Sequence, residues 1–377
     1  MNSLTVKSLT VKSLTLLTAL ALLLGSVASV AGPEEPPAPR PRPVRVPDFR
    51  EVYRETPVTR AVDRGIGYLR RTQLEDGSWL SPSYGKNTGI VSLAVLSLLA
   101  RGHEPGRGEH GQVIERAVAW LLDVQRDGLL HRDAQDSHGA LYSHGIATLL
   151  LGELAGMLDE RLPPFESFSR VHRSAVNTIL RAQNVPKASP VHVGGWRYTV
   201  TARYSDISVS GWQLLALRSA QESGLQVTLR SIEQAVGFIR RCALPDGGFD
   251  YFPGHQESTL GRTGTGVLAL EICGEHNSPE ALRGGDWMLK HPLAWNDPFF
   301  YYSAYYGAQA MYQLGGRYWE RWQPLSEKVL LEEQDADGKW RLPPNAPFEA
   351  KAGHVYTTAL AILSLSVEFR YLPIYQR

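Results

Sequence analysis

The chain has 377 residues, of which 43% are hydrophobic, and its formal net charge at pH 7 is +1. This length and composition suffice for one large hydrophobic core or two of ordinary size. The near-neutral charge lacks the basic excess that nucleic-acid-binding proteins use to contact phosphates, so we expect no nucleic-acid partner.

The first 31 residues have the pattern of a secretory signal peptide. Lys7 and Lys12 precede an apolar run, residues 14–24, and small residues follow up to Ala31. The apolar run is too short for a typical transmembrane helix, although retention as an uncleaved anchor is an alternative. We therefore expect an exported protein that is periplasmic, extracellular or associated with the cell envelope.

Residues 32–57 are predicted to form a spacer, because proline is frequent in their first half. Proline-rich segments favour the extended polyproline conformation and do not pack into a core. The folded part is therefore expected to cover residues 58–377 as one domain.

The folded part contains one short pattern twice. Residues 73–79 read QLEDGSW and residues 334–340 read QDADGKW, and both fit Q-x-x-D-G-x-W. The copies lie 261 residues apart, which corresponds to five steps of about 52 residues. The first unit begins near Arg64, and degenerate copies begin near Arg116, Ser174, Gln234 and Arg283. Each copy consists of an amphipathic segment, a turn and a second segment, which predicts six helical hairpins.

The two segments of a unit differ in their polarity. The second segments, such as residues 89–101, 146–158 and 357–368, are apolar on nearly all faces, whereas first segments such as residues 115–126 keep a charged stripe. A helix that is apolar all round is buried all round. The sequence therefore predicts an all-α fold, a six-hairpin α/α toroid with inner and outer rings of helices. An open solenoid is the alternative, but it would expose inner helices at its ends.

The first of these patterns, together with the helix before it, resembles the QW motif of the squalene-cyclase and protein-prenyltransferase repeat superfamily. The second pattern is similar to the latter half of that motif, and the likeness extends over roughly residues 58–370. In that superfamily the Gln amide stacks on the Trp and hydrogen-bonds to free backbone groups at neighbouring helix ends. The resemblance thus implies the toroid fold and a structural role for Gln73, Gly77, Trp79, Gln334, Gly338 and Trp340.

The catalytic motifs of that superfamily are not found in the chain. Squalene cyclases protonate an alkene with the middle acid of D-x-D-D, whereas the matching positions here are Asp206, Ser208 and Val209. Prenyltransferases hold zinc with an Asp-x-Cys pair and a distant His, but residues 261–265 provide no such ligands and only His354 lies near the right place. Whether the protein is an enzyme stays open, and we expect no cofactor.

Two further patterns are interpreted as structural. Residues 273–276 read CGEH and share three letters with the C-G-E-Q thioester of complement-type toroids, but His276 cannot supply the acyl group. The loop 131–138, followed by His144, lacks the i, i+4 spacing of a helical metal pair, so we predict no metal site. Cys242 and Cys273 are expected to stay unpaired, because one helix length, roughly 16 Å, separates them, whereas a disulfide needs Cα atoms within about 7 Å.

Polar and aromatic residues near the starts of the inner helices are the candidates for a binding site, because a toroid would bring them together at one mouth of its funnel. Asp206 is the one weak candidate for a catalytic carboxylate. The candidate ligand-binding residues are Tyr142, His144, Tyr198, Arg203, Tyr204, Asp206, Arg262, Tyr302, Tyr306, His354 and Tyr356.

Three functions are compatible with these residues. The first, which we favour, is binding of a small molecule, a peptide or a glycan segment in the funnel by a monomeric protein. The second is an enzyme of the same fold with altered active-site residues, either of the cyclase or transferase type or acting on carbohydrate. Glycoside hydrolysis would need two carboxylates, and Asp206 and Glu257 are the only obvious pair. The third is a structural envelope protein, whose tyrosines merely fill the centre of the ring.

Overall fold

Two sets of six helices alternate along the computed structural model, which describes residues 54–131 and 139–376. The outer helices are α2 (Pro57–Thr72), α4 (Gly108–Asp123), α6 (Phe168–Gln183), α8 (Leu229–Arg241), α10 (Pro279–Lys290) and α12 (Gly316–Glu332). The inner helices are α3 (Thr88–Ala100), α5 (Ala140–Glu153), α7 (Ile207–Glu222), α9 (Leu260–Ile272), α11 (Phe300–Leu314) and α14 (His354–Leu365). Shorter elements are α13 (Pro347–Ala352), η1 (Phe165–Ser167), η2 (Pro190–His192), η3 (Val367–Phe369) and η4 (Pro373–Tyr375).

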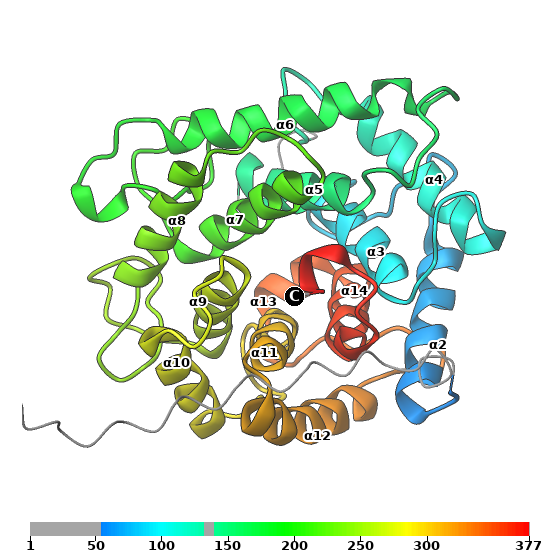
Figure 1. The fold of residues 1–377 in the computed structure, drawn as a ribbon. Helices are drawn as coiled ribbons and strands as arrows, with labels where there is room; N and C mark the ends of the chain where they lie inside the picture. The colour runs from blue at the N-terminus through cyan, green and yellow to red at the C-terminus, as the bar shows by residue number, and fades with distance from the viewer. Residues whose placement is uncertain (1–53, 132–138, 377) are drawn as a thin grey trace, which may run out of the picture. The chain divides into compact units, whose positions relative to one another are not determined.

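The inner helices form a closed ring. Each of α3, α5, α7, α9 and α11 packs against the next, α11 packs against α14, and α14 returns to α3 (Figure 1). The last outer helix, α12, likewise contacts the first, α2. These contacts confirm the predicted α/α toroid, and the open solenoid is wrong. In the part of the chain that the structure describes, no segment forms a β-strand.

The burial of the helices follows the polarity pattern of the sequence. Every residue of α3 is buried, whereas α8 buries mainly one stripe that includes Ile232, Val236 and Ile239. A helix with one apolar stripe lies between a core and solvent, and a helix without a polar face lies inside. Helix α2 begins at Pro57 with Thr56 as its N-cap, so the folded part starts slightly before the predicted position.

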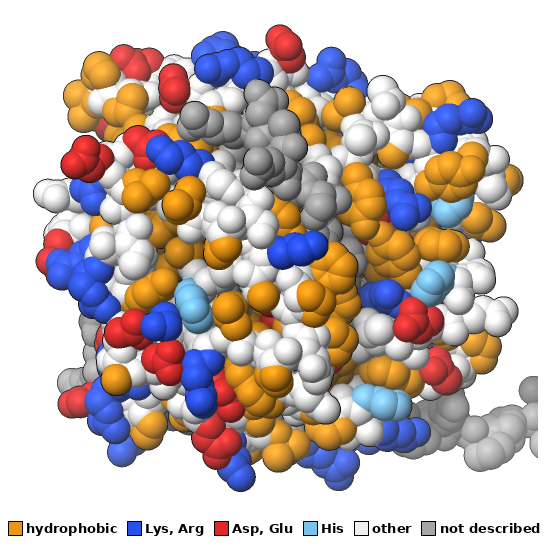
Figure 2. Space-filling view, turned by 180° about the vertical axis from the view of Figure 1, so that it is seen from behind, with side chains coloured by type: hydrophobic (Ala, Val, Ile, Leu, Met, Phe, Trp, Pro, Cys, Tyr) orange, Lys and Arg blue, Asp and Glu red, His pale blue; other side chains and the backbone are white. Residues whose placement is uncertain are grey.

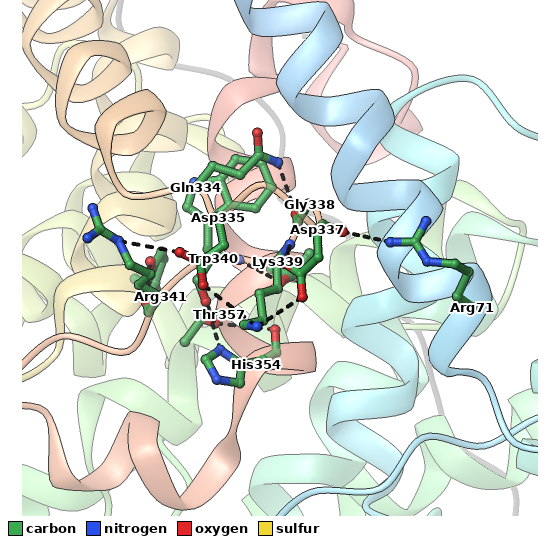
Figure 3. A network of polar contacts seen from close by, with 12 residues as sticks. Arg71, Gln334, Asp335, Asp337, Gly338, Lys339, Trp340, Arg341, His354 and Thr357 are labelled. Carbon is green, nitrogen blue, oxygen red and sulfur yellow. Dashed lines mark hydrogen bonds and ion pairs between the residues drawn. The ribbon is translucent and has the colours of Figure 1, made fainter.

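The turn after α12 joins the last hairpin to the first (Figure 3). Gln334 donates from Nε2 to the carbonyl of Gly338 in its own turn (3.0 Å) and to that of Ala61 in α2 (2.8 Å). The Trp340 indole donates to the Leu330 carbonyl at the end of α12 (2.7 Å). Because Ala61 belongs to the first hairpin, the Gln334 side chain closes the outer ring.

The same set of hydrogen bonds recurs in two other turns. After α2, the Gln73 side chain donates to the carbonyls of Gly77 and Val113, and the Trp79 indole donates to the carbonyl of Leu69. After α6, the Gln183 side chain donates to the carbonyls of Gly194 and Ser231, and the Trp196 indole donates to the carbonyl of Ile179. The acceptors Val113 and Ala61 lie inside α4 and α2, one turn or more from the helix start. The expectation that the amide would serve free groups at helix ends is therefore corrected at these two sites.

Glycine is required in these turns for two reasons. Gly338 has φ +94°, and a Cβ atom there would lie 2.3 Å from the Arg64 carbonyl oxygen of α2. Gly77 has φ +89°, and its Cβ would lie 2.2 Å from the Arg116 carbonyl oxygen of α4. Both backbones are left-handed and touch the next outer helix, so a side chain at either position would separate neighbouring hairpins.

The C-terminal segment closes one end of the ring, near the centre of Figure 1. The Ile374 amide donates to Oε2 of buried Glu153 (3.2 Å), and the Tyr375 and Tyr305 hydroxyls lie 2.5 Å apart. Ile374 and Tyr375 are buried, and η4 packs on α7. The centre of the ring is therefore reached from the other end, where the inner helices begin.

Among the described residues, no helix combines the length and apolar character needed to span a membrane. Cys242 and Cys273 are both free; Cys242 caps α8 and Cys273 caps α9. The predicted signal peptide and most of the predicted spacer lie outside the described residues.

Candidate functional site

A cavity of about 690 Å³ lies at the N-terminal ends of the inner helices. Its walls carry more apolar than polar surface, and aromatic side chains contribute from several helices and loops. Prominent among them are Tyr84, Tyr142, Tyr198, Tyr251, Tyr302 and Tyr356. This size and this mixture of aromatic and polar groups are typical of small-molecule sites.

Five of the predicted site residues line this cavity: Tyr142, Tyr198, Arg262, Tyr302 and Tyr356. Tyr302 donates its hydroxyl hydrogen to Ser208 (3.0 Å) and lies 2.9 Å from the Thr265 hydroxyl. Burial raises the pKa of Tyr302 to about 12, so its hydroxyl stays protonated and fixed at neutral pH. Ser208, the residue at the position of the cyclase acid, also faces the cavity.

His144 has a structural role instead of the predicted ligand-binding one. It is fully buried, and its Nδ1 accepts from the Leu130 amide (3.0 Å) while its Nε2 lies 3.1 Å from the Ala175 carbonyl. Burial lowers the pKa of His144 to about 4, so the ring is neutral and Nε2 donates. In three other units a hydroxyl accepts the backbone amide that corresponds to that of Leu130. The hydroxyls are those of Ser210, Thr263 and Thr358, and the amides are those of Trp196, Phe249 and Trp340.

Four more predicted residues do not line the cavity. Tyr306 is buried inside the ring against Trp212, and His354 bonds through Nδ1 to the Trp340 carbonyl (2.9 Å). Arg203 donates to the Pro186 carbonyl (3.3 Å), and Tyr204 is 54% exposed. Arg203 and Tyr204 belong to the segment between η2 and α7, and the Tyr204 ring packs edge-on against that of His192 in η2. These positions are corrected accordingly.

Asp206 caps a helix beside the cavity. Its Oδ1 accepts from the Val209 amide at the start of α7 (2.9 Å), and its Oδ2 lies 3.9 Å from Arg197. Burial raises the pKa of Asp206 to about 7, although the Val209 amide and Arg197 lower it. Asp206 does not line the cavity, whereas Glu257 does and pairs with Arg262 (3.2 Å). The two carboxylates that the sequence suggested as a pair therefore do not face each other across the cavity.

Two carboxyl groups that line the cavity were missed from the sequence. Glu349, in α13, is 2% exposed and accepts through Oε1 from the amides of Tyr301 (2.8 Å) and Tyr302 (3.1 Å) at the start of α11. Its Oε2 has no hydrogen-bond partner among the described residues. Asp297, just before α11, accepts from the Phe299 amide (2.7 Å). The sequence feature that points to Glu349 is a single acidic residue in the segment of few charges, residues 342–353, that precedes the last inner helix.

Burial favours the protonated form of both carboxyls. It raises the pKa of Glu349 to about 8, against the two amides that lower it, and the negative charge of Asp297 raises it further. Burial also raises the pKa of Asp297, against its hydrogen bonds to Phe299 and Ser303. At neutral pH the cavity therefore contains a carboxylic acid that is largely protonated.

An aromatic pair lies at the rim of the cavity. The rings of Phe299 and Phe348 stack with centroids 5.4 Å apart and a 16° angle between planes, and they are 36% and 41% exposed. The Lys351 ammonium lies 5.7 Å from the centroid of Phe348. The face turned away from the viewer in Figure 1 is shown in Figure 2, where hydrophobic and uncharged side chains are frequent in the middle.

No group of three or more His, Cys, Asp or Glu in residues 54–131 and 139–376 could hold a metal ion. The loop considered as a metal site lies mostly outside these ranges, at residues 132–138.

The closed double ring and the cavity at the starts of its inner helices define an α/α toroid protein. The model of the prenyltransferase alpha-alpha toroid domain family matches residues 89–299, which is more than half of the chain. The chain therefore belongs to this family. A comparison with curated proteins found no match.

Solved structures show the same fold. The GH76A alpha-1,6-mannanase from Salegentibacter sp. HEL1_6 superposes with a TM-score of 0.58 at 9% identity, covering 82% of this chain and 98% of the mannanase. The type II terpene cyclase MstE from Scytonema gives a TM-score of 0.53 at 13% identity, covering 84% of this chain and 99% of the cyclase. At such low identity the likeness extends to the fold alone.

Proposed function

We propose that the protein binds a small molecule, or the end of a longer chain, in the cavity at the starts of its inner helices. The observation that carries the proposal is the cavity itself, about 690 Å³ with aromatic walls and a few polar groups. A close-packed core leaves few voids larger than a water molecule, so a cavity of this size has a reason other than packing. The cavity supports binding over the structural interpretation, in which the tyrosines merely fill the centre of the ring.

The geometry limits how a ligand enters. Because η4 and the Glu153 contact close the other end of the ring, a polymer cannot pass through and only one end of it can be inserted. Apolar walls favour a ligand with an apolar body, and the fixed hydroxyl of Tyr302 and the carboxyls of Asp297 and Glu349 favour a polar group on it.

The binding proposal can be tested with prodan, a neutral naphthyl ketone whose fluorescence shifts to the blue in apolar surroundings. Leu93 lines the cavity and is 1% exposed, so Leu93→Trp would fill part of it. Leu80 is 62% exposed and does not line the cavity, so Leu80→Trp is the matched control. We expect the wild type and Leu80→Trp to bind prodan and Leu93→Trp to lose binding while staying folded. Equal binding by all three would show that the cavity is not the site.

We also propose that the protein works outside the cytoplasm, because residues 1–31 have the pattern of a signal peptide. Mass spectrometry of the protein from its own cells should give a mature chain that begins at Gly32. A cytoplasmic, full-length chain would contradict export, and a membrane-bound, full-length chain would indicate the uncleaved anchor.

A second candidate function is acid-catalysed hydrolysis of a glycoside. It is favoured by the carboxyl groups of Asp297 and Glu349, which line one cavity together with Glu257, because most glycosidases use a protonated acid and a second carboxylate. A variant of the Salegentibacter mannanase was solved in complex with alpha-1,6-mannotetrose. Incubation with this tetrasaccharide, followed by measurement of new reducing ends, tests the candidate. Activity that disappears in Asp297→Asn would support it, and no activity would remove this substrate.

A further inference from the structure

We propose that Glu349 is the polar anchor of the cavity and recognises an uncharged hydrogen-bond acceptor, such as a carbonyl or ether oxygen, on the bound molecule. The inference rests on the proposed binding function and specifies the chemical class of ligand. It assigns to Glu349 the role of hydrogen-bond donor through Oε2.

The two oxygens of Glu349 have different surroundings. Oε1 accepts two backbone N–H groups from Tyr301 and Tyr302, so both of its acceptor positions are used. Oε2 is buried and has no partner among the described residues, although Glu349 lines a cavity large enough for a ligand. Buried polar atoms in native proteins nearly always have a partner. Other buried side-chain atoms of the described residues also lack a partner, but only Oε2 of Glu349 belongs to a residue that lines the cavity, so we assign its partner to a ligand group.

The groups around Glu349 determine which form of the carboxyl meets the ligand. The described titratable groups that face it are Asp297 before α11, Tyr301 on α11 and Tyr356 on α14. None of these three provides a positive charge, and burial together with Asp297 favours the protonated form. Because Oε1 is already used by two donors, the proton belongs on Oε2, which then donates to an acceptor.

A cationic ligand is the alternative, since aromatic walls and carboxylates also suit an ammonium group. The cationic residues of the cavity lining argue against it, because Lys351 would repel a cation and Arg262 already pairs with Glu257. An anionic ligand would in turn meet the acidic side chains of Asp297 and Glu257, which also line the cavity. An uncharged acceptor avoids both repulsions, so it fits this set of groups best.

The experiment compares ligands of one shape that differ in one group. Prodan is displaced from the protein at pH 6.5 by 2-acetylnaphthalene, which has an acceptor, by 2-ethylnaphthalene, which has none, and by 2-naphthyltrimethylammonium, which is cationic. The proteins are the wild type, Glu349→Gln, Glu349→Ala and Glu153→Gln. Glu153 is the matched control because burial also raises its pKa, to about 7, but it lies at the closed end of the ring.

We expect the wild type and Glu153→Gln to prefer 2-acetylnaphthalene over 2-ethylnaphthalene by about tenfold, as for one good hydrogen bond. Glu349→Gln should keep the preference, because the amide oxygen can accept the two backbone N–H groups while its NH₂ donates. Glu349→Ala should lose it. Between pH 6.5 and pH 9.5 the preference of the wild type should disappear as Glu349 ionises, whereas that of Glu349→Gln should not change.

Each other outcome overturns a specific statement. A wild type that binds no prodan contradicts the proposed binding function itself. Prodan binding without a preference for the ketone, or a preference that survives in folded Glu349→Ala, contradicts only the role of Glu349. Tightest binding of the ammonium compound, lost in Glu349→Gln, would show that Glu349 acts as a carboxylate for cations. If Glu349→Ala does not fold, the pH dependence and Glu349→Gln still decide the matter.

Discussion

Replacing Glu349 by Gln is expected to change how the stability of the protein depends on pH, with no ligand present. The folded-state pKa of Glu349 is raised to about 8 from an ordinary value of 4.5, mainly by burial. Between these two values the folded protein holds a proton that the unfolded chain has released. The free energy of unfolding therefore falls as pH rises through this window and becomes constant above it.

The size of the effect follows from the shift. Each pH unit inside the window changes the free energy of unfolding by up to about 1.4 kcal/mol per group, so Glu349 accounts for about 2 kcal/mol between pH 6.5 and pH 9. Buried Glu153 and Asp206 contribute with the same sign at lower pH, since their pKa values are raised to about 7. Both groups are present in the wild type and in Glu349→Gln. The difference between the free energies of unfolding of the two proteins therefore reports on Glu349 alone.

The assay is urea unfolding of both proteins, followed by tryptophan fluorescence at several values between pH 6.5 and pH 9. Glu349→Gln should gain about 2 kcal/mol relative to the wild type across this range, because the wild type loses stability and the amide does not titrate. Parallel profiles for the two proteins would refute the reasoning. They would mean that Glu349 is already ionised at pH 6.5 and cannot donate a hydrogen bond.

Four other predictions concern the ring, its helix caps and the segment before α7. Trp79→Ala and Trp340→Ala should each lower the free energy of unfolding by about 3–5 kcal/mol, since both indoles are fully buried; unchanged melting temperatures would contradict this. Gly338→Ala should cost at least about 1 kcal/mol through its left-handed backbone alone, as measured by urea unfolding. Asp206→Asn should keep its helix cap and melt within a few degrees of wild type, and Arg203→Ala should leave prodan affinity unchanged, because Arg203 lies outside the cavity.

The architecture could be predicted because it is encoded in a repeated pattern. Six amphipathic segments alternate with segments that are apolar all round, and hydrophobic periodicity separates these two kinds of helix. The Q-x-x-D-G-x-W segments mark the turns between helices, because their glycines adopt a left-handed backbone that depends only on the turn itself. In the structure these glycines contact the residues at which the next unit begins, such as Arg116 for Gly77 and Arg64 for Gly338.

The candidate site was predicted only in part, for a related reason. An inner helix has no polar face, so the sequence does not show which of its side chains face the cavity and which face an outer helix. Tyr302 and Tyr306 illustrate this limit, because they are one helical turn apart and only Tyr302 lines the cavity. Glu349 was missed because α13 lies between the last turn and α14, outside the repeated pattern.

The capping of the inner helices gives a reason why Glu349 differs from its counterparts. Asn87, Asp206 and Thr259 cap α3, α7 and α9 with their own side chains from the ordinary N-cap position. Helix α11 begins after Phe299, which has no capping side chain, and a carboxyl from another helix accepts its first amides instead. A serine or threonine at position 299 would cap α11 by the ordinary local means. Oδ2 of Asp206 also lacks a hydrogen-bond partner among the described residues, but Asp206 does not line the cavity, whereas Glu349 does, and for this reason we assign the missing partner of Glu349 to a bound molecule.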